Sequence, residues 1–141
     1  MQSPDVNILV EAFRPGGEHH EVCRRWLDEA VNAPAPLAVV PTVLSGFVRI
    51  VTHPRIFAQP NSTEEALGFC ETFVLDDVVE FLEPGPAHWT IFSTLCRSSG
   101  ARGNLVPDAW LAAVMIENGC EFITLDRDFA RFEGLRWSVP G

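Results

Sequence analysis

Residues 104–129 read NLVPDAWLAAVMIENGCEFITLDRDF, and this stretch decides the fold class. Residues 107–118 predict a helix that Gly119 ends, because proline suits a first helical turn and glycine is favoured just beyond the last one. The short apolar run at 122–125 is typical of a buried strand. A helix that leads directly into such a strand is the repeating unit of a parallel sheet covered by helices.

The same alternation of short apolar runs and longer helical segments continues through the rest of the chain. Further strands are predicted at residues 37–40, 78–82 and 136–139. Helices are predicted at residues 19–31, 43–51, 61–74 and 86–96, and a first helix at 5–13 begins with Asp5. Pro34 and Pro36 mark a loop before the strand at 37–40. The predicted fold is therefore α/β, one domain over residues 1–141, with a small parallel sheet flanked by helices on both faces.

The charge of the chain narrows the classes of function. The net charge is −9, and all ten bases are arginines. The absence of lysine excludes a P-loop nucleotide site, a Schiff-base enzyme and a receiver-type phosphorelay pocket, since each needs one. An acidic chain is also a poor nucleic-acid coat protein. A nuclease can still be acidic, because metal ions supply positive charge locally while a few arginines bind phosphate.

Composition also indicates where the protein works. No apolar stretch reaches the roughly 18 to 20 residues that span a bilayer, and the start MQSPDVN lacks the features of a signal peptide. We therefore expect a cytoplasmic protein without a membrane partner. The four cysteines are spread without close pairs, so we interpret them as reduced core thiols. The four histidines are poorly spaced for a zinc site.

Four acids carry the predicted chemistry, namely Asp5, Asp108, Asp126 and Asp128. Each lies where an element begins or ends, and such positions converge at the carboxyl ends of parallel strands, where ligands bind. Clustered carboxylates repel one another unless a cation offsets the cost. Oxygen-only ligands suit Mg²⁺ or Mn²⁺, which bridge to substrate phosphate and activate water. The sequence thus indicates hydrolysis of a phosphodiester.

Each acid also has a structural interpretation. Asp108 follows Pro107 and suits the first turn of a helix through the macrodipole alone. Asp126 and Asp128, in LDRDF, suit a plain turn after a strand. Asp5, near the start of the chain, suits a solvated acid. The combination of all four favours the functional interpretation.

Three ordered acidic motifs and one further string connect the chain to a known family. These are DVNILVEAF at 5–13, NLVPDAWLAAVMIENG at 104–119, FITLDRDFARFEGLRW at 122–137 and THPRIF at 52–57. Together they resemble the PIN-domain family, in particular the VapC toxins of bacterial toxin-antitoxin pairs. The similarity covers nearly the whole chain.

The resemblance implies a PIN-like domain that cleaves RNA with Mg²⁺ or Mn²⁺, self-associates as a homodimer and is inhibited by a small cognate antitoxin of the VapB type. The implied site residues are Asp5, Asp108, Asp126 and Asp128, with Asn7 and Thr124 as polar supports. The family commonly has a glutamate where this chain has Gly46, after Ser45, so a metal-supporting carboxylate is missing here. The usual apolar strand before the first aspartate is reduced to MQSP.

Arginines are the natural phosphate contacts, because their planar forks match phosphate oxygens. Arg97 and Arg102 fall in CRSSGARGN, which we expect to be a flexible loop ahead of Asp108, and our hypothesis is that they bind the RNA backbone. A solvated polar loop is the alternative. Trp26 and Trp110 are expected in the core rather than stacked on bases.

Two other functions stay open from the sequence. One is a PIN-like module that has lost efficient catalysis through the missing glutamate and acts by binding RNA or a protein. The other is a phosphatase that uses the pair in LDRDF, which is less favoured because no lysine is present to hold the phosphoryl group.

Overall fold

The computed structural model describes residues 1–77 and 79–141. The helices are α1 (Val6–Phe13), α2 (His20–Asn32), α3 (Pro41–Val51), α4 (Thr63–Val74), α5 (His88–Ser99) and α6 (Leu105–Asn118), with a 3-10 helix η1 (Arg127–Arg131). The strands are β1 (Gln2–Pro4), β2 (Leu37–Val39), β3 (Val79–Phe81), β4 (Glu121–Ile123) and β5 (Trp137–Ser138). Val78, the first residue of the strand predicted at 78–82, lies outside the described residues.

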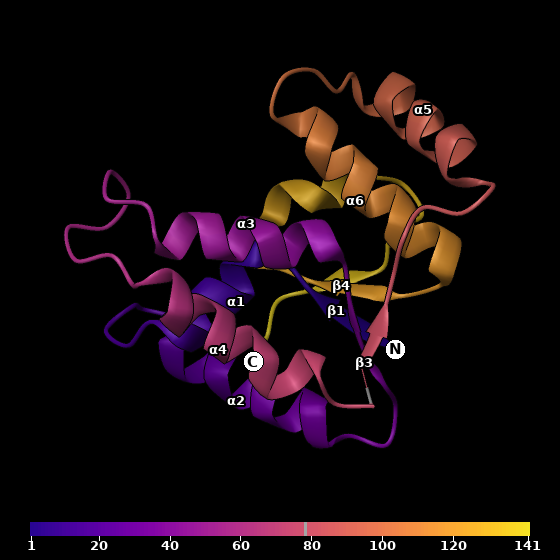
Figure 1. Cartoon of the computed structure of the whole chain (residues 1–141). Coiled ribbons are helices and arrows are strands. Elements are labelled where there is room, and N and C mark those ends of the chain that lie inside the picture. Colours follow the sequence, from indigo (N-terminus) through magenta and orange to yellow (C-terminus); the bar gives the residue numbers. More distant parts are fainter. Residues whose placement is uncertain (78) are drawn as a thin grey trace.

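The five strands form one parallel sheet in the order β3-β2-β1-β4-β5. Strand β1 is central, and its register against β4 pairs Ser3 with Phe122 and Pro4 with Ile123. In Figure 1, α5 and α6 lie on one side of the sheet while α2 and α4 lie on the other. The predicted α/β class, with a small parallel sheet flanked by helices, is confirmed.

The strands predicted at 37–40, 122–125 and 136–139 are confirmed as β2, β4 and β5, and the described part of 78–82 contains β3. Strand β1 was not among the predicted strands. Its three residues, Gln2 to Pro4, show no apolar alternation, and their strand state comes from pairing with β2 and β4 on both sides. The first strand is therefore present but short.

Local signals place most helix ends close to where they were predicted. Helix α4 begins with a capping box, in which Ser62 and Glu65 each accept a backbone N–H of the other. Helix α6 begins at Leu105, two residues before the predicted start at Pro107. A proline is tolerated there because the first helical N–H groups need no partner within the helix.

Helix α5 was predicted too short. It continues to Ser99 and ends at Gly100, which adopts the left-handed conformation. Arg97 therefore lies in its last turn rather than in a loop, and the prediction of a loop across residues 96–99 is wrong. A basic residue there is favourable beside the negative end of the helix dipole.

Rings from three helices fill the core between α1, α3 and α4. Phe13, Phe47, Phe69 and Phe73 form a chain with ring centroids 4.8 to 5.6 Å apart. A second set, Phe122, Phe129 and Phe132, packs η1 against β4. These contacts hold the segment after β4 close to the sheet.

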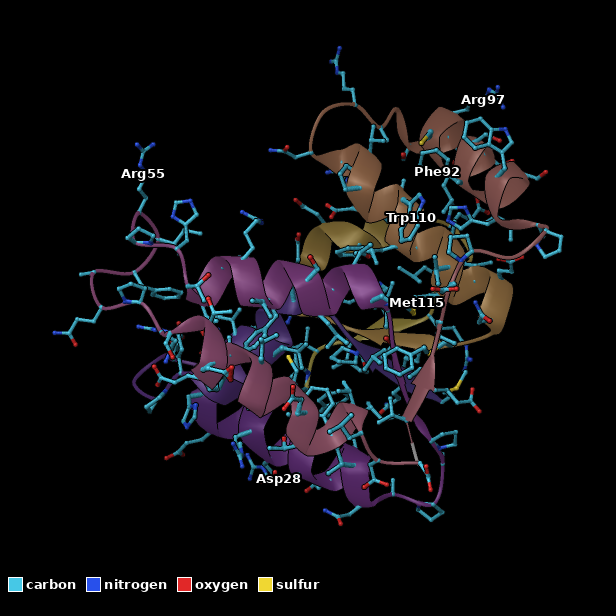
Figure 2. All side chains as sticks on the ribbon, viewed as in Figure 1. Asp28, Arg55, Phe92, Arg97, Trp110 and Met115 are labelled. Carbon is cyan, nitrogen blue, oxygen red and sulfur yellow. The ribbon has the colours of Figure 1, made fainter. Side chains whose placement is uncertain are left out.

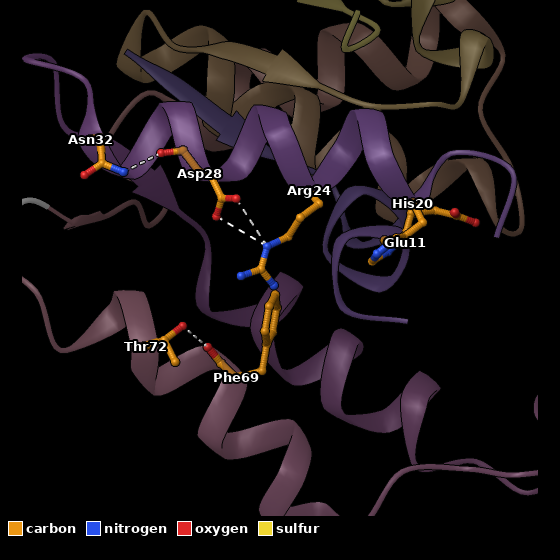
Figure 3. Close-up of polar contacts among 7 residues, drawn as sticks. All are labelled: Glu11, His20, Arg24, Asp28, Asn32, Phe69 and Thr72. Atoms are coloured by element: carbon orange, nitrogen blue, oxygen red, sulfur yellow. Dashed lines mark hydrogen bonds and ion pairs between the residues drawn. The ribbon is translucent and has the colours of Figure 1, made fainter. Parts of the chain in front are cut away.

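The outward side of α2 is polar and exposed. Figure 3 shows Arg24 paired with Asp28 one turn later, with Nε 3.3 Å from Oδ1, and Asn32 donating to the backbone carbonyl of Asp28. Both partners of the ion pair are more than half exposed, so the pair adds little stability.

Cys23, Cys70 and Cys120 are buried and Cys96 is half-buried, and all four are free thiols, as predicted. Burial raises the pKa of the Cys23, Cys70 and Cys120 thiols to about 11, so they are not reactive thiolates. Within residues 1–77 and 79–141, no helix combines the length and the apolar character needed to cross a lipid bilayer.

Candidate active site

The sheet order places the ends of β1 and β4 side by side. Asp5 follows β1 directly and Thr124 follows β4, and the Asp5 backbone N–H donates to the Ile123 carbonyl over 2.8 Å. The strand order reverses between β1 and β4. From β1 the chain adds β2 and then β3 on one side of the sheet, whereas β4 and β5 lie on the other side of β1. Open parallel sheets bind ligands at such a switch point.

The Asp5 carboxylate is held by three donors and is only 6% exposed. Oδ1 accepts the Val6 backbone N–H at 2.7 Å, which makes Asp5 the N-cap of α1. Oδ2 accepts the Thr124 hydroxyl at 2.7 Å and the Asn7 side-chain amide at 3.2 Å. These bonds fix the carboxylate in one orientation at the carboxyl end of β1.

Asn7 and Thr124 each form further hydrogen bonds besides those to Asp5. The Asn7 Oδ1 accepts the Leu125 backbone N–H at 3.1 Å, and its Nδ2 lies 3.4 Å from Thr124 Oγ1. Thr124 Oγ1 also accepts the Asp126 backbone N–H at 3.0 Å. The two polar residues therefore tie the start of α1 to the segment that carries Asp126.

Asp126 and Asp128 lie at the start of η1. Asp126 is the N-cap, and its Oδ1 accepts the Asp128 backbone N–H at 2.9 Å. The Asp128 carboxylate is exposed and lies 3.9 Å from an Arg131 nitrogen. Asp126 is thus held in place by its own turn, while Asp128 faces solvent near the rim of the site.

Asp108 reaches the same region from the first turn of α6. Burial, and after it the negative charges of Asp5, Asp126 and Asp128, raise its pKa to about 6, while the positive charge of Arg131 acts in the opposite direction. All four acids are therefore close enough to interact electrostatically. The structure brings together residues that lie up to 123 positions apart in sequence.

The pKa of Asp5 is also raised, mainly by burial and also by the charge of Asp126. The hydrogen bonds from Thr124, Val6 and Asn7 act in the opposite direction, because they stabilise the ionised form. Burial outweighs them. The site therefore holds more negative charge than its own surroundings stabilise.

This donor set fits a hard divalent cation. Carboxylate oxygens are the ligands that Mg²⁺ and Mn²⁺ prefer, and the raised pKa of Asp108 marks a place where a positive charge would relieve repulsion. In the part of the chain that the structure describes, no three or more His, Cys, Asp or Glu side chains are grouped so that they could hold a metal ion. The acids converge electrostatically without a preassembled ligand shell.

A cavity of about 550 Å³ opens beside Asp5 and Asp108, between α3 and the pair α5 and α6. Gly46 lies in its wall, so the position where the family commonly has a glutamate does face the acids, and here it offers no carboxylate. The residues that line the cavity are Asp5, Val6, Thr42, Val43, Gly46, Arg49, Ile50, Phe92, Val106, Pro107, Asp108, Trp110 and Leu111.

Arg97 and Arg102, the predicted phosphate contacts, do not line this cavity. In Figure 2, Arg97 lies on the outer part of α5 and points away from the fold. Arg49, which the sequence did not single out, lines the cavity instead. Arg49 lies in the last turn of α3, where an exposed arginine is common, so the sequence does not distinguish it from other surface charges.

Trp26 and Trp110 pack against the core, as predicted. Trp110 has a second role, since it also lines the cavity. Its backbone carbonyl lies 3.0 Å from Nε2 of the buried His88, which links α6 to α5. Figure 2 shows Phe92 and Trp110 in the region where α5 packs on α6. The aromatic wall of the cavity is thus part of the packed helix pair.

Comparison with known sequences gives consistent results over almost the whole chain. Residues 4–135 match the PIN domain model. The chain is 38% identical over 140 residues to Ribonuclease VapC43 of Mycobacterium tuberculosis, covering 99% of this chain and 95% of that protein. It is 37% identical over 136 residues to Ribonuclease VapC25 of the same organism, covering 96% of each.

Solved structures share the fold at low sequence identity. VapBC2 from Rickettsia felis, bound to a DNA fragment from its promoter, has a TM-score of 0.72 at 17% identity and covers 99% of this chain and 98% of that chain. VapC20 of Mycobacterium tuberculosis, a toxin that cleaves the sarcin-ricin loop, has a TM-score of 0.66 at 18% identity and covers 96% and 99%.

Proposed function

This chain belongs to the PIN-domain family, in its VapC-type branch, and on that premise we propose that it is an endoribonuclease that depends on Mg²⁺ or Mn²⁺ and acts as the toxin of a toxin-antitoxin pair. The observation that carries the proposal is the convergence of Asp5, Asp108 and Asp126 beside the ends of β1 and β4. The names of its relatives, which are ribonucleases, support the substrate class.

Asp5, Asp108 and Asp126 would hold the cation, with Asp128 at the rim. When bound, the cation supplies positive charge for phosphate oxygens and acidity for a water molecule. Thr124 and Asn7 orient Asp5 through their hydrogen bonds to its Oδ2. Asp126 is held by the Thr124 hydroxyl through its backbone N–H, so one threonine positions two of the acids.

The test is cleavage of RNA by purified protein during a Mn²⁺ titration. We expect activity that rises with Mn²⁺, stops when a chelator is added and is lost in Asp108→Asn. Asp28→Asn is the matched control, because Asp28 is an exposed acid on α2 that pairs with Arg24 outside the site. Activity that persists in Asp108→Asn, or without a divalent cation, would contradict the proposal.

A catalytically weakened module is the second candidate, and Gly46 is the observation that favours it. Gly46 lines the cavity beside Asp5 and Asp108 and offers no metal ligand there. The same Mn²⁺ titration separates the two functions. RNA binding without cleavage at any Mn²⁺ concentration favours the module, whereas cation-dependent cleavage favours the enzyme.

The partner follows from the same proposal. Two of the solved structures that share the fold are VapBC assemblies, from Rickettsia felis and from Salmonella typhimurium. We expect this chain to bind a VapB-like antitoxin and to form a homodimer, and a net charge of −9 favours a basic partner segment. Expression of the chain alone should slow growth, and co-expression of the adjacent small open reading frame should restore it. Unchanged growth in both cases would contradict the toxin role.

A further inference from the structure

The cavity beside the acids carries one positive side chain. Arg49 lies in the last turn of α3 and lines the same cavity as Asp5 and Asp108. Elsewhere, Arg24 pairs with Asp28 and Arg131 with Asp128. Among the described residues, the Arg49 guanidinium has no carboxylate within ion-pair distance and donates no hydrogen bond. Its charge is therefore available to a ligand in the cavity.

Gly46 leaves the charge of Arg49 without a partner on the same helix. It precedes Arg49 by three positions on α3, the spacing at which a glutamate pairs with an arginine on a helix surface. A Cβ at Gly46 would meet only Val6 Cγ2, at 3.8 Å, so the space in front of it is open. The same glycine thus removes a carboxylate from the acid cluster and keeps both the cavity and Arg49 unobstructed.

The remaining wall is mostly apolar. Phe92 and Trp110 contribute aromatic rings, and Val106 and Leu111 contribute aliphatic groups from α6. A cavity of about 550 Å³ is within the range that accepts a small organic ligand. An aromatic wall beside a free guanidinium matches a nucleotide, which combines a planar base with a phosphate.

We propose that this cavity is a nucleotide subsite, in which Arg49 binds a phosphate of the RNA strand next to the cleaved bond and the Phe92 and Trp110 side receives a base. This inference rests on the proposed function. The acids repel phosphate, so a strand that lies against them needs a fixed cation close by. Arg49 is the cation that lines the same cavity.

The first experiment measures the affinity of a fluorescently labelled single-stranded RNA of mixed sequence, in chelator, at several salt concentrations. Arg49→Ala should weaken binding by about tenfold, as loss of a charged hydrogen bond does. The slope of log affinity against log salt should fall by about 0.7, the value for one phosphate contact on a single strand. Arg49→Lys should keep the salt slope of the wild type and recover part of the affinity, because lysine keeps the positive charge but lacks the planar guanidinium that binds phosphate through two N–H groups.

Arg55→Ala is the matched control for charge. Figure 2 shows Arg55 on an outer loop, pointing away from the fold, and it does not line the cavity. A second pair of variants tests the cavity itself. Gly46→Leu should fill the open space and weaken RNA binding. Gly68→Leu, at another helical glycine whose Cβ would meet nothing within 4 Å, should leave RNA binding unchanged.

The outcomes separate this inference from the proposed function. If the wild type neither binds nor cleaves RNA, both are wrong. If the wild type cleaves RNA while Arg49→Ala matches Arg55→Ala in affinity and salt slope, the proposed function stands and the subsite is overturned. If Arg49→Ala weakens only the complex with the co-expressed antitoxin, the cavity belongs to a protein partner and the subsite is also overturned.

Discussion

The hydroxyl of Thr124 donates to Oδ2 of Asp5 over 2.7 Å, and 119 positions separate the two residues in sequence. The bond joins the end of β4 to the end of β1, the two neighbouring strands at the switch point of the sheet. Thr124 is fully buried, and its oxygen also accepts the Asp126 backbone N–H. One hydroxyl therefore fixes two acids that the chain delivers from opposite ends.

Thr124→Val removes this hydroxyl while keeping the shape of the side chain. We expect a loss of about 1–3 kcal/mol in the free energy of unfolding, because the Asp126 N–H and the buried Asp5 carboxylate each lose a partner. Urea denaturation measures the loss. Thr72→Val on α4, where the hydroxyl binds only its own helix, is the control and should change stability by less than about 0.5 kcal/mol. Equal losses in both variants would refute the role of Thr124.

In the metal-free protein, the substitution Asp108→Asn should increase the free energy of unfolding near neutral pH. The folded pKa of Asp108 is raised from 3.8 to about 6, so the folded state binds more protons than the unfolded state between these values. Stability due to this group is therefore fully present below about pH 4 and is lost as the pH rises through about 6. The melting temperature of the variant should exceed that of the wild type at pH 7, and the difference should shrink towards pH 4. A difference that is independent of pH would contradict the electrostatic account.

Gly46→Glu should tighten Mn²⁺ binding. The substitution adds a carboxylate to the wall of the cavity that Asp5 and Asp108 share, and the neighbouring atoms leave room for it. Isothermal titration calorimetry measures the affinity. Gly46→Gln is the matched control, since it adds the same volume without the charge and should leave Mn²⁺ affinity near the wild-type value. If glutamate and glutamine give the same affinity, residue 46 does not take part in metal binding.

Ser3→Ala should stabilise the fold by about 1 kcal/mol, because a buried hydroxyl without a partner costs free energy. Ser3 is fully buried in the central strand β1, and in the part of the chain that the structure describes its hydroxyl has no hydrogen-bond partner. Urea denaturation measures the change. Destabilisation by a similar amount would mean that the hydroxyl is hydrogen-bonded in solution, for instance to a buried water.

Much of the fold could be predicted because its signals are local. Gly119 ends α6 in the left-handed conformation that glycine favours, and Ser62 caps α4, so the sequence alone placed these ends within a residue or two. Strand β1 carries no such signal. Gln2 to Pro4 become a strand through pairing with neighbours that are distant in sequence.

The candidate site also contains residues that local signals predict and residues that only the packing places. The four acids could be predicted because each borders a helix or strand, and Asn7 and Thr124 followed from the family resemblance. Arg49 could not, because its position in the cavity depends on where the fold places α3 relative to α6, on whose residues the cavity also opens. The loop expected to bring Arg97 towards Asp108 is in part the last turn of α5, and the arginine points outward.

We propose that Asp5, Asp108 and Asp126 gather around a divalent cation. Crystals grown with Mn²⁺ and measured for anomalous scattering test it most directly. We expect an anomalous peak among these three carboxylates in the wild type and a lost or weakened peak in Asp108→Asn. A wild-type map without a peak there, from protein that still cleaves RNA, would contradict the claim.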